Sequence, residues 1–241
     1  MKKELQDGIL YIFNQLGKNC LKPRGFKRKG NSYKREKRDV IEIVSLQTHR
    51  SIQPNEILFT INLSIRIKLL GECDTYYPGI FHGGHWTERL GALLDKDTIE
   101  RLWVTNSLER WDILAERLVG KDNWWALRTD SDVEFLTKEV AKVLCEKGIP
   151  LLEENASEEK ILEKWVSGQG SGILEHPYIS AAVFLKLRGD DEGSERMIQK
   201  VLDNEGEPGV NFLRSRIEVA MQNLRAKRLI EKISRQRESS K

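Results

Sequence analysis

Lysine and arginine are concentrated in one short segment near the start of the chain, and these are the side chains that bind phosphates. Residues 22–38 hold nine of them and one acid, Glu36, with Phe26 and Tyr33 interleaved. Each cation that neutralises a phosphate releases counterions, and exposed aromatic rings stack on unpaired bases. The segment is therefore a candidate nucleic-acid site. Its predicted contacts are Lys22, Arg24, Lys27, Arg28, Lys29, Lys34 and Arg35.

The same segment also has a structural interpretation, which we favour. Gly30-Asn31 is a turn signal, so residues 26–29 and 32–37 predict a β-hairpin. Phe26 and Tyr33 are then its inward residues, and the cations are its solvated face. Basic side chains also keep an exposed edge strand from pairing with other chains.

Other chemistry has less support in the sequence. His82 and His85 are three residues apart with Cys73 upstream, but a metal site needs three or four convergent ligands. We therefore predict no metal and no cofactor. No G-x-S-x-G nucleophile signature and no phosphate-binding glycine loop is present. We identify no catalytic residue, and an enzyme is the least favoured class of function.

Two segments predict strands. Residues 39–48 are rich in β-branched side chains on both faces, which indicates burial on both sides, and residues 58–69 alternate between apolar and polar. Neighbouring strand residues point to opposite faces, so we expect either Trp124 or Trp125 to be exposed, in an edge strand or turn over 121–129. These polar and aromatic positions form a second candidate surface, for a protein partner. Its residues are Asn62, Ser64, Arg66, His85, Trp86, Trp124 and Trp125.

Helical periodicity dominates the rest of the chain. A helix over 3–17 is expected to end at Gly17, Pro23 and Gly25. Later helices are predicted at 87–94, 108–119, 133–144, 157–166, 177–188, 192–203 and 208–236. Thr87 is the predicted cap of the helix at 87–94. For the helix at 133–144, Asp130 or Ser131 is the predicted cap, and Gly148 and Pro150 are the predicted stop signals. The linker candidate is Gly168–Gly172. The predicted fold is α+β: an N-terminal helix, an antiparallel sheet of three to five strands, and an α-helical C-terminal half. The predicted domains are 1–150 and 151–241.

Charge is distributed unevenly along the chain. The net charge is +9 for residues 1–68, −12 for residues 69–213 and +6 for residues 214–241. The basic tail predicts a helix that packs one face on the body, or that lies on nucleic acid or an anionic membrane surface. Three widely spaced cysteines indicate no disulfide framework and a reducing compartment. With no signal peptide and no apolar run long enough to span a bilayer, we expect a cytoplasmic protein.

Several short motifs resemble, in order, a bacterial family catalogued as domain of unknown function 4304. They are residues 21–33 (LKPRGFKRKGNSY), 40–43 (VIEI), Leu46-Gln47, 59–63 (FTINL), 85–91 (HWTERLG) and Trp124-Trp125. Lys34-Arg35 departs from the pattern, which has an aromatic or apolar residue there. The resemblance covers roughly residues 1–150 and implies a compact α+β domain with an antiparallel sheet and no assigned catalytic residues.

These observations favour a cytoplasmic, non-enzymatic protein-interaction module. An immunity-like protein that neutralises a toxin is one concrete version, by analogy of fold and size. The alternative is a nucleic-acid-binding accessory protein that uses residues 22–38 and the basic C-terminal helix.

Overall fold

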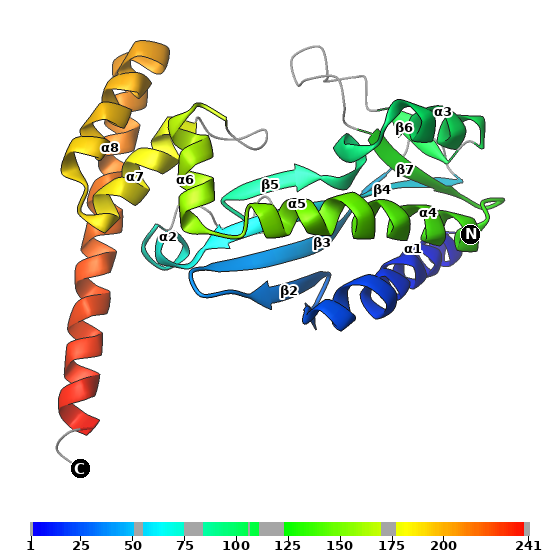
Figure 1. Cartoon of the computed structure of the whole chain (residues 1–241), viewed down its shortest axis with the longest axis horizontal. Helices are drawn as coiled ribbons and strands as arrows, with labels where there is room; N and C mark the ends of the chain where they lie inside the picture. The colour runs from blue at the N-terminus through cyan, green and yellow to red at the C-terminus, as the bar shows by residue number, and fades with distance from the viewer. Residues whose placement is uncertain are drawn as a thin grey trace. The chain divides into compact units, whose positions relative to one another are not determined.

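The chain forms two compact units, each assembled from separate stretches of sequence. The computed structural model (Figure 1) describes residues 2–50, 55–74, 84–105, 107–110, 123–169 and 177–238. The first unit comprises residues 1–37, 41–65 and 87–156, and the second comprises residues 38–40, 66–86 and 157–241. A short middle segment of the sequence therefore folds together with the C-terminal helices.

The described strands form a seven-stranded sheet that lies mostly in the first unit. Its order is β1-β2-β3-β4-β7-β6, with β5 paired to β4. The strands are β1 Lys27–Lys29, β2 Ser32–Glu36, β3 Val40–Arg50, β4 Glu56–Ile67, β5 Trp86–Arg89, β6 Leu108–Arg110 and β7 Asn123–Arg128. The pairings β1–β2, β2–β3, β4–β7 and β6–β7 are antiparallel. The predicted α+β fold is confirmed, with more strands than expected.

The predicted hairpin is confirmed as β1 and β2, with Gly30 in the left-handed conformation (φ 58°) that this turn requires. Strand β4 ends at Ile67, two residues before the predicted end, because the chain turns there into a helix. Strand β7 lies between β4 and β6, so its prediction as an edge strand was wrong. Leu108–Arg110 is a strand and not the start of a helix. Residues 111–119 of that predicted helix lie outside the described residues.

Helices cover one face of the sheet in the first unit. They are α1 Lys2–Leu16, the π-helical turn η1 Gly17–Leu21, the 3₁₀ turn η2 Lys22–Arg24, the 3₁₀ turn η3 Leu90–Leu93, α3 Lys96–Val104, α4 Val133–Val143, the π-helical turn η4 Leu144–Gly148 and α5 Ile149–Glu154. Tyr33 of β2 meets Phe13 of α1 edge-on, with ring centroids 5.1 Å apart. Arg35, two residues along the same strand face, reaches Glu153 of α5. Helices α1 and α5 therefore cover the same side of the sheet, and α1 packs beside α4.

The predicted helix stops in this unit were wrong at Gly17, Pro23, Gly148 and Pro150, whereas Gly25 (φ 83°) does cap the end of η2. The first helix continues past Gly17 into η1, and Gly17 is needed there because a Cβ atom would clash with the Tyr33 ring. Helix α4 continues through η4 and Pro150 to Glu154, since a proline is tolerated in the first turn of α5. The cap of α4 is Asp132, whose carboxylate accepts a hydrogen bond from Phe135 N–H at 3.0 Å.

Two further differences concern residues 87–104. Thr87 lies in β5 and does not cap a helix, although Leu90–Leu93 does form a short 3₁₀ turn. Helix α3 was not predicted at all.

The second unit is a helical cluster. It contains α2 Lys68–Cys73, α6 Glu158–Val166, α7 Pro177–Arg188 and α8 Asp191–Glu238. Helix α7 is buried along most of its length, and it packs against α6 and α8 (Figure 1). Helix α8 is broken at Gly206 (φ 70°, ψ −169°), two residues before Pro208. The two helices predicted at 192–203 and 208–236 are thus confirmed as the halves of a kinked helix.

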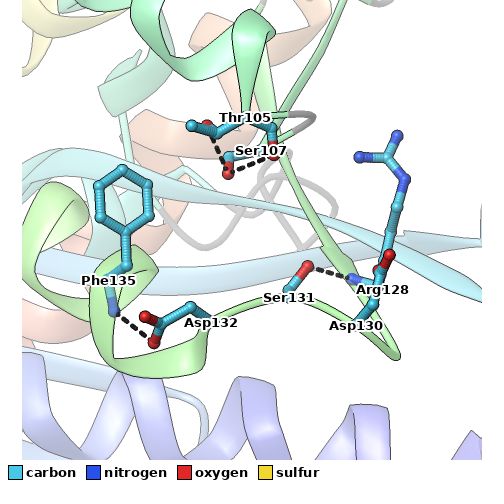
Figure 2. A pocket seen from close by; sticks show the side chains of 7 residues that line it. All are labelled: Thr105, Ser107, Arg128, Asp130, Ser131, Asp132 and Phe135. Carbon is cyan, nitrogen blue, oxygen red and sulfur yellow. Dashed lines mark hydrogen bonds between the residues drawn. The ribbon is translucent and has the colours of Figure 1, made fainter.

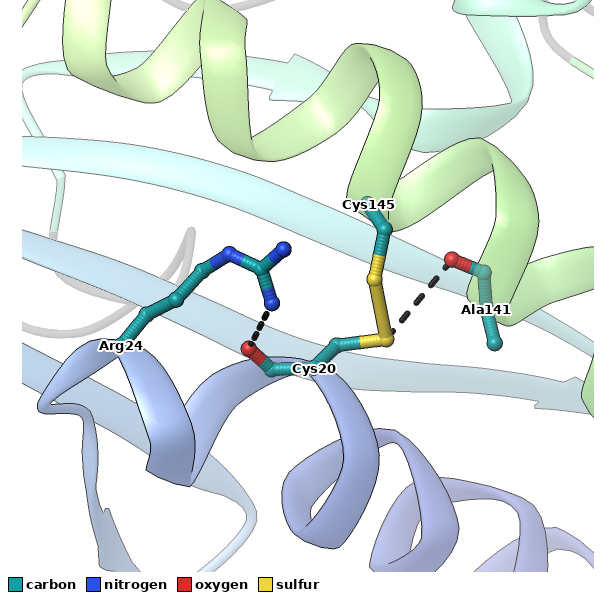
Figure 3. Close-up of a disulfide and its surroundings, with 4 residues drawn as sticks. All are labelled: Cys20, Arg24, Ala141 and Cys145. Atoms are coloured by element: carbon teal, nitrogen blue, oxygen red, sulfur yellow. Dashed lines mark hydrogen bonds between the residues drawn. A yellow bond between two sulfur atoms is a disulfide. The ribbon is translucent and has the colours of Figure 1, made fainter.

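A disulfide joins Cys20 of η1 to Cys145 of η4, with Cα atoms 6.1 Å apart (Figure 3). The cysteine spacing indicated no disulfide framework, so this single bond was not expected. The two residues are 125 positions apart, and only the packing of the two π-helical turns brings them together. In the loop-entropy model, closing a loop of this length stabilises a fold by about 5 kcal/mol.

Candidate interaction surfaces

The aromatic residues of the basic segment face the interior. Phe26 and Tyr33 are 2% and 1% exposed. Arg28 lies over the Tyr33 ring, 5.9 Å from its centroid, and donates hydrogen bonds to the Gly30 carbonyl and to Asn14 of α1. Neither aromatic ring is placed to stack on a base, which agrees with the structural interpretation of these two residues.

Arg35 is bonded to three other residues. It donates to both oxygens of Glu42 at 2.5 and 2.9 Å, to Glu153 at 2.9 Å and to the Arg24 carbonyl at 3.0 Å. Its guanidinium lies 4.4 Å from the Phe26 ring centroid. The hydrogen bond to Glu42 raises the pKa of Arg35, because it favours the charged form. Arg24 in turn donates to the Cys20 carbonyl at 2.8 Å. Arg24, Arg28 and Arg35 thus hold the hairpin to the body of the first unit.

The lysines of the segment occupy a different face of the hairpin. Lys27 and Lys29 are exposed and two residues apart in β1, so they share one face. Lys34 is directly opposite Lys27 in the antiparallel pairing. Like charges at directly opposed positions destabilise a sheet. We call Lys27, Lys29 and Lys34 the lysine face. Lys22 is exposed in η2, outside this face.

The predicted partner surface on the sheet is mostly interior. Asn62 and Ser64 are buried; Asn62 donates to the Gln47 side chain at 3.0 Å, and Ser64 shares a 3.0 Å hydrogen bond with Thr87. Their polarity is therefore satisfied inside the protein, which is the usual condition of buried polar groups. Arg66 is half-buried and donates to the Gly71 carbonyl at 2.9 Å.

The tryptophans of this predicted surface are also interior. The expectation that Trp124 or Trp125 is exposed was wrong: they are 3% and 0% exposed, because both faces of β7 are covered. Trp125 stacks on Phe59 with centroids 6.0 Å apart, and Arg89 lies 5.2 Å from the Trp124 ring centroid. Trp86 is buried as well, with the Lys164 ammonium 5.3 Å from its ring centroid.

A buried polar cluster lies in the second unit. His85 Nδ1 accepts a hydrogen bond from Ile67 N–H at 2.9 Å, and burial, aided by the nearby Arg66 and Arg216, lowers the His85 pKa to about 3. Arg216 forms an ion pair with Asp74, and both side chains are buried. A neutral His85 that accepts a backbone hydrogen bond at Nδ1 has a structural role.

The metal-ligand set considered from the sequence is only partly described. Cys73 is buried, and that burial raises the pKa of its thiol, while His82 lies outside the described residues. Within the described part of the chain, no three His, Cys, Asp or Glu side chains lie close enough together to hold a metal ion.

A small pocket of about 280 Å³ lies between the end of α3 and the turn that joins β7 to α4 (Figure 2). Its hydroxyl groups are engaged locally: Ser131 accepts from Arg128 N–H at 2.8 Å, and Thr105 donates to Ser107 at 2.9 Å. Sequence analysis did not predict this pocket. Because its bonds build a turn and a helix cap, we assign it no catalytic role. Its lining consists of Thr105, Ser107, Arg128, Asp130, Ser131, Asp132 and Phe135.

The C-terminal part of α8 presents aliphatic side chains to solvent. Leu229, Ile230 and Ile233 are 58%, 64% and 41% exposed, and Ala226 lies on the same helix face. We call these four residues the tail stripe. A groove of about 420 Å³ adjoins it, where Asn223 donates to the Cys73 carbonyl at 2.7 Å and Lys227 pairs with Glu72. The expected packing of one helix face holds for Val210, Leu213, Ala220 and Leu224, whereas residues 228–236 are exposed.

Protonation of His85 should make the second unit acid-sensitive. Because its native pKa is depressed from 6.5 to about 3, the unfolded chain takes up a proton first, and stability falls as the pH drops through this window. The slope is about 1.4 kcal/mol per pH unit. His85→Gln keeps an acceptor for Ile67 N–H but does not titrate, so acid unfolding of this variant should lose that slope.

The imidazole nitrogen chemical shifts of His85, measured by NMR, should stay constant between about pH 5 and pH 8. A titration midpoint inside that range would contradict a neutral, buried His85.

Comparison with known proteins identifies the family of the chain. A family model described as domain of unknown function (DUF4304) matches residues 17–154, more than half of the chain. This segment includes the basic hairpin, the sheet and both disulfide cysteines, whereas the tail stripe lies outside it. No curated protein and no solved structure gives a significant match. The predicted family is confirmed: the chain belongs to the DUF4304 family.

Proposed function

We propose that this chain is a non-enzymatic protein-interaction module whose partner binds the tail stripe of α8. The observation that carries the proposal is the exposure of Leu229, Ile230 and Ile233 together on one helix face. Contiguous apolar side chains at the surface of a folded protein mark places where another molecule binds. The adjoining groove provides a concave edge for the same contact.

The spacing of the tail stripe favours a helical partner. Ala226, Ile230 and Ile233 follow one another at intervals of four and three residues, which is the pattern of a helix–helix seam. Such a stripe is narrower than the apolar face of a helix that lies in a lipid interface.

The charge around the stripe favours an acidic partner. Residues 225–238 carry six basic and two acidic side chains. Helical geometry places Arg225 and Lys232 along the edge of the stripe next to Leu229. A second copy of this helix would bring like charges together, which opposes pairing, whereas an acidic helix would be complementary.

An immunity-like role, in which the module masks an acidic toxin in the cytoplasm, is the concrete version that we favour. It rests on analogy of fold and size.

Two aspartates in the tail stripe should weaken partner binding. In Ile230→Asp/Ile233→Asp the seam is polar and the local charge falls by two, so we expect at least about a tenfold loss of affinity. The measurement is quantitative recovery of each co-purifying protein from host extract by wild type and variant. Since both side chains are exposed, the circular dichroism spectrum and melting temperature should not change.

Arg228→Glu is the matched control, because it changes the charge by the same amount on the opposite side of the helix. Partners that bind the stripe should be retained by this variant. Equal recovery by wild type and the Ile230/Ile233 variant would contradict the proposed surface.

One observation favours a second candidate function, binding of nucleic acid. The lysine face brings together the exposed Lys27 and Lys29 with Lys34 opposite Lys27, and each lysine that neutralises a phosphate releases counterions. In this version the lysines contact phosphates, and the arginines support the hairpin.

This second candidate predicts a specific salt dependence. Lys27→Gln/Lys29→Gln should lower the slope of log affinity against log salt by about two, measured by fluorescence anisotropy with labelled single- and double-stranded DNA. Lys138→Gln/Lys142→Gln, at exposed positions on α4, removes the same charge elsewhere and is the control. Undetectable binding at low salt, or the same change of slope in both variants, would exclude the candidate.

A further inference from the structure

We propose that the Cys20–Cys145 disulfide is a reversible redox clamp that fixes the base of the basic hairpin to the α4–η4–α5 helix. This proposal is independent of the proposed partner and of the second unit. The disulfide connects two π-helical turns from opposite ends of the family segment, and Figure 3 shows it beside Arg24 and Ala141.

The clamp lies where the first helix passes into the hairpin. The Cys20 carbonyl accepts the hydrogen bond of Arg24, and the next carbonyl, that of Leu21, accepts from Phe26 N–H at 3.2 Å. At the start of the same π-helical turn, Gly17 packs against the Tyr33 ring of β2. A shift of η1 therefore displaces both ends of the hairpin at once.

Both cysteines lie in π-helical turns, η1 and η4. Such turns are rare departures from the α-helix and are frequent at functional sites. The disulfide links η1 to η4, so each π-helical turn holds the other in place. Reduction of the disulfide allows both segments to relax toward an ordinary α-helix, so the oxidised and reduced states should differ in local order.

The two sulfur atoms differ in accessibility. Cys20 is 2% exposed, whereas Cys145 is half-buried. A low-molecular-weight thiolate therefore attacks Cys145 Sγ and forms a mixed disulfide there, while Cys20 leaves as a thiolate and takes up a proton. A second thiolate attacks the external sulfur of the mixed disulfide and releases Cys145. Two thiols are oxidised to one small disulfide, and the protein gains two electrons and two protons.

The cell compartment makes this exchange relevant. In the cytoplasm that we propose for this chain, thiol systems keep most cysteines reduced, and disulfides that do form there are usually transient. Cys73 lies buried in the other unit and is not in the disulfide, so it offers no competing partner within the described structure.

The test uses the full-length protein in glutathione buffers that range from fully reduced to fully oxidised. After acid quenching, the protein is denatured and alkylated, and its thiols are counted by mass spectrometry. The count should change reversibly from three to one, because Cys73 remains a thiol in both states. Hydrogen exchange of residues 17–24 and 144–148 should be about tenfold faster in the reduced form, whereas α7 should not change.

Two variants separate the clamp from other thiol chemistry. Cys73→Ala should keep the transition, now from two thiols to none. Cys20→Ser/Cys145→Ser should show the fast exchange in every buffer; if that variant fails to fold, the fully reduced wild type provides the same comparison. A count of one thiol in all buffers would make the disulfide a permanent structural bond, and a count of three would mean that it does not form. Either result, or equal hydrogen exchange in the two states, would overturn the proposal.

Discussion

The buried carboxylate of Glu42 is the constraint on which the N-terminal half of the first unit depends. Its side chain is fully buried in β3, where an unpaired charge would cost several kcal/mol. Arg35 supplies two hydrogen bonds from the neighbouring strand, and the same guanidinium also reaches Glu153 of α5 and the carbonyl of Arg24. One side chain thus ties the hairpin to a central strand, to a covering helix and to the turn after α1.

The cost of leaving a buried polar group unpaired also affects the polar residues elsewhere on the sheet. Both faces of β4 and β7 are covered, and most polar side chains there have a partner inside the protein, whereas Thr60 Oγ1 and the Trp125 indole N–H have no hydrogen-bond partner among the described residues. Asn62 pairs with Gln47, and Ser64 with Thr87, while Arg128 and Glu56 form an ion pair. Asn62 and Ser64 of β4 are thus bonded inside the protein. Among the described residues, Leu229, Ile230 and Ile233 near the end of α8 are aliphatic side chains that are exposed together.

Elements with strong local signals could be predicted from the sequence. The hairpin followed from Gly30-Asn31 and the inward positions of Phe26 and Tyr33, and the C-terminal helices followed from their periodicity. The missed features depend on packing. Gly17 is a stop signal in most contexts, yet here it allows the helix to continue because the Tyr33 ring occupies the space of its missing Cβ. The disulfide could not be predicted from the sequence, because it joins segments 125 residues apart.

The candidate surfaces, too, could be located from the sequence only where they depend on local signals and not on packing. Composition located the basic segment, but it could not separate Arg35, which is held by Glu42, from Lys27, which is exposed. In α8, Leu224 and Ile230 have similar side chains, and only packing buries the first and exposes the second. Trp124 and Trp125 were expected to differ in exposure, and the cover on both faces of β7 makes them alike.

The role of Arg35 is the claim that a single measurement tests most directly. A double-mutant cycle with Arg35→Met and Glu42→Met, followed by hydrogen exchange of β2 and β3, gives the coupling free energy between the two side chains. We expect Arg35→Met alone to destabilise these strands by about 3 kcal/mol, and the double variant to regain at least about 2 kcal/mol of the summed loss. A coupling close to zero would contradict the account, because Arg35 would then be available to bind a ligand and would not be required by the fold.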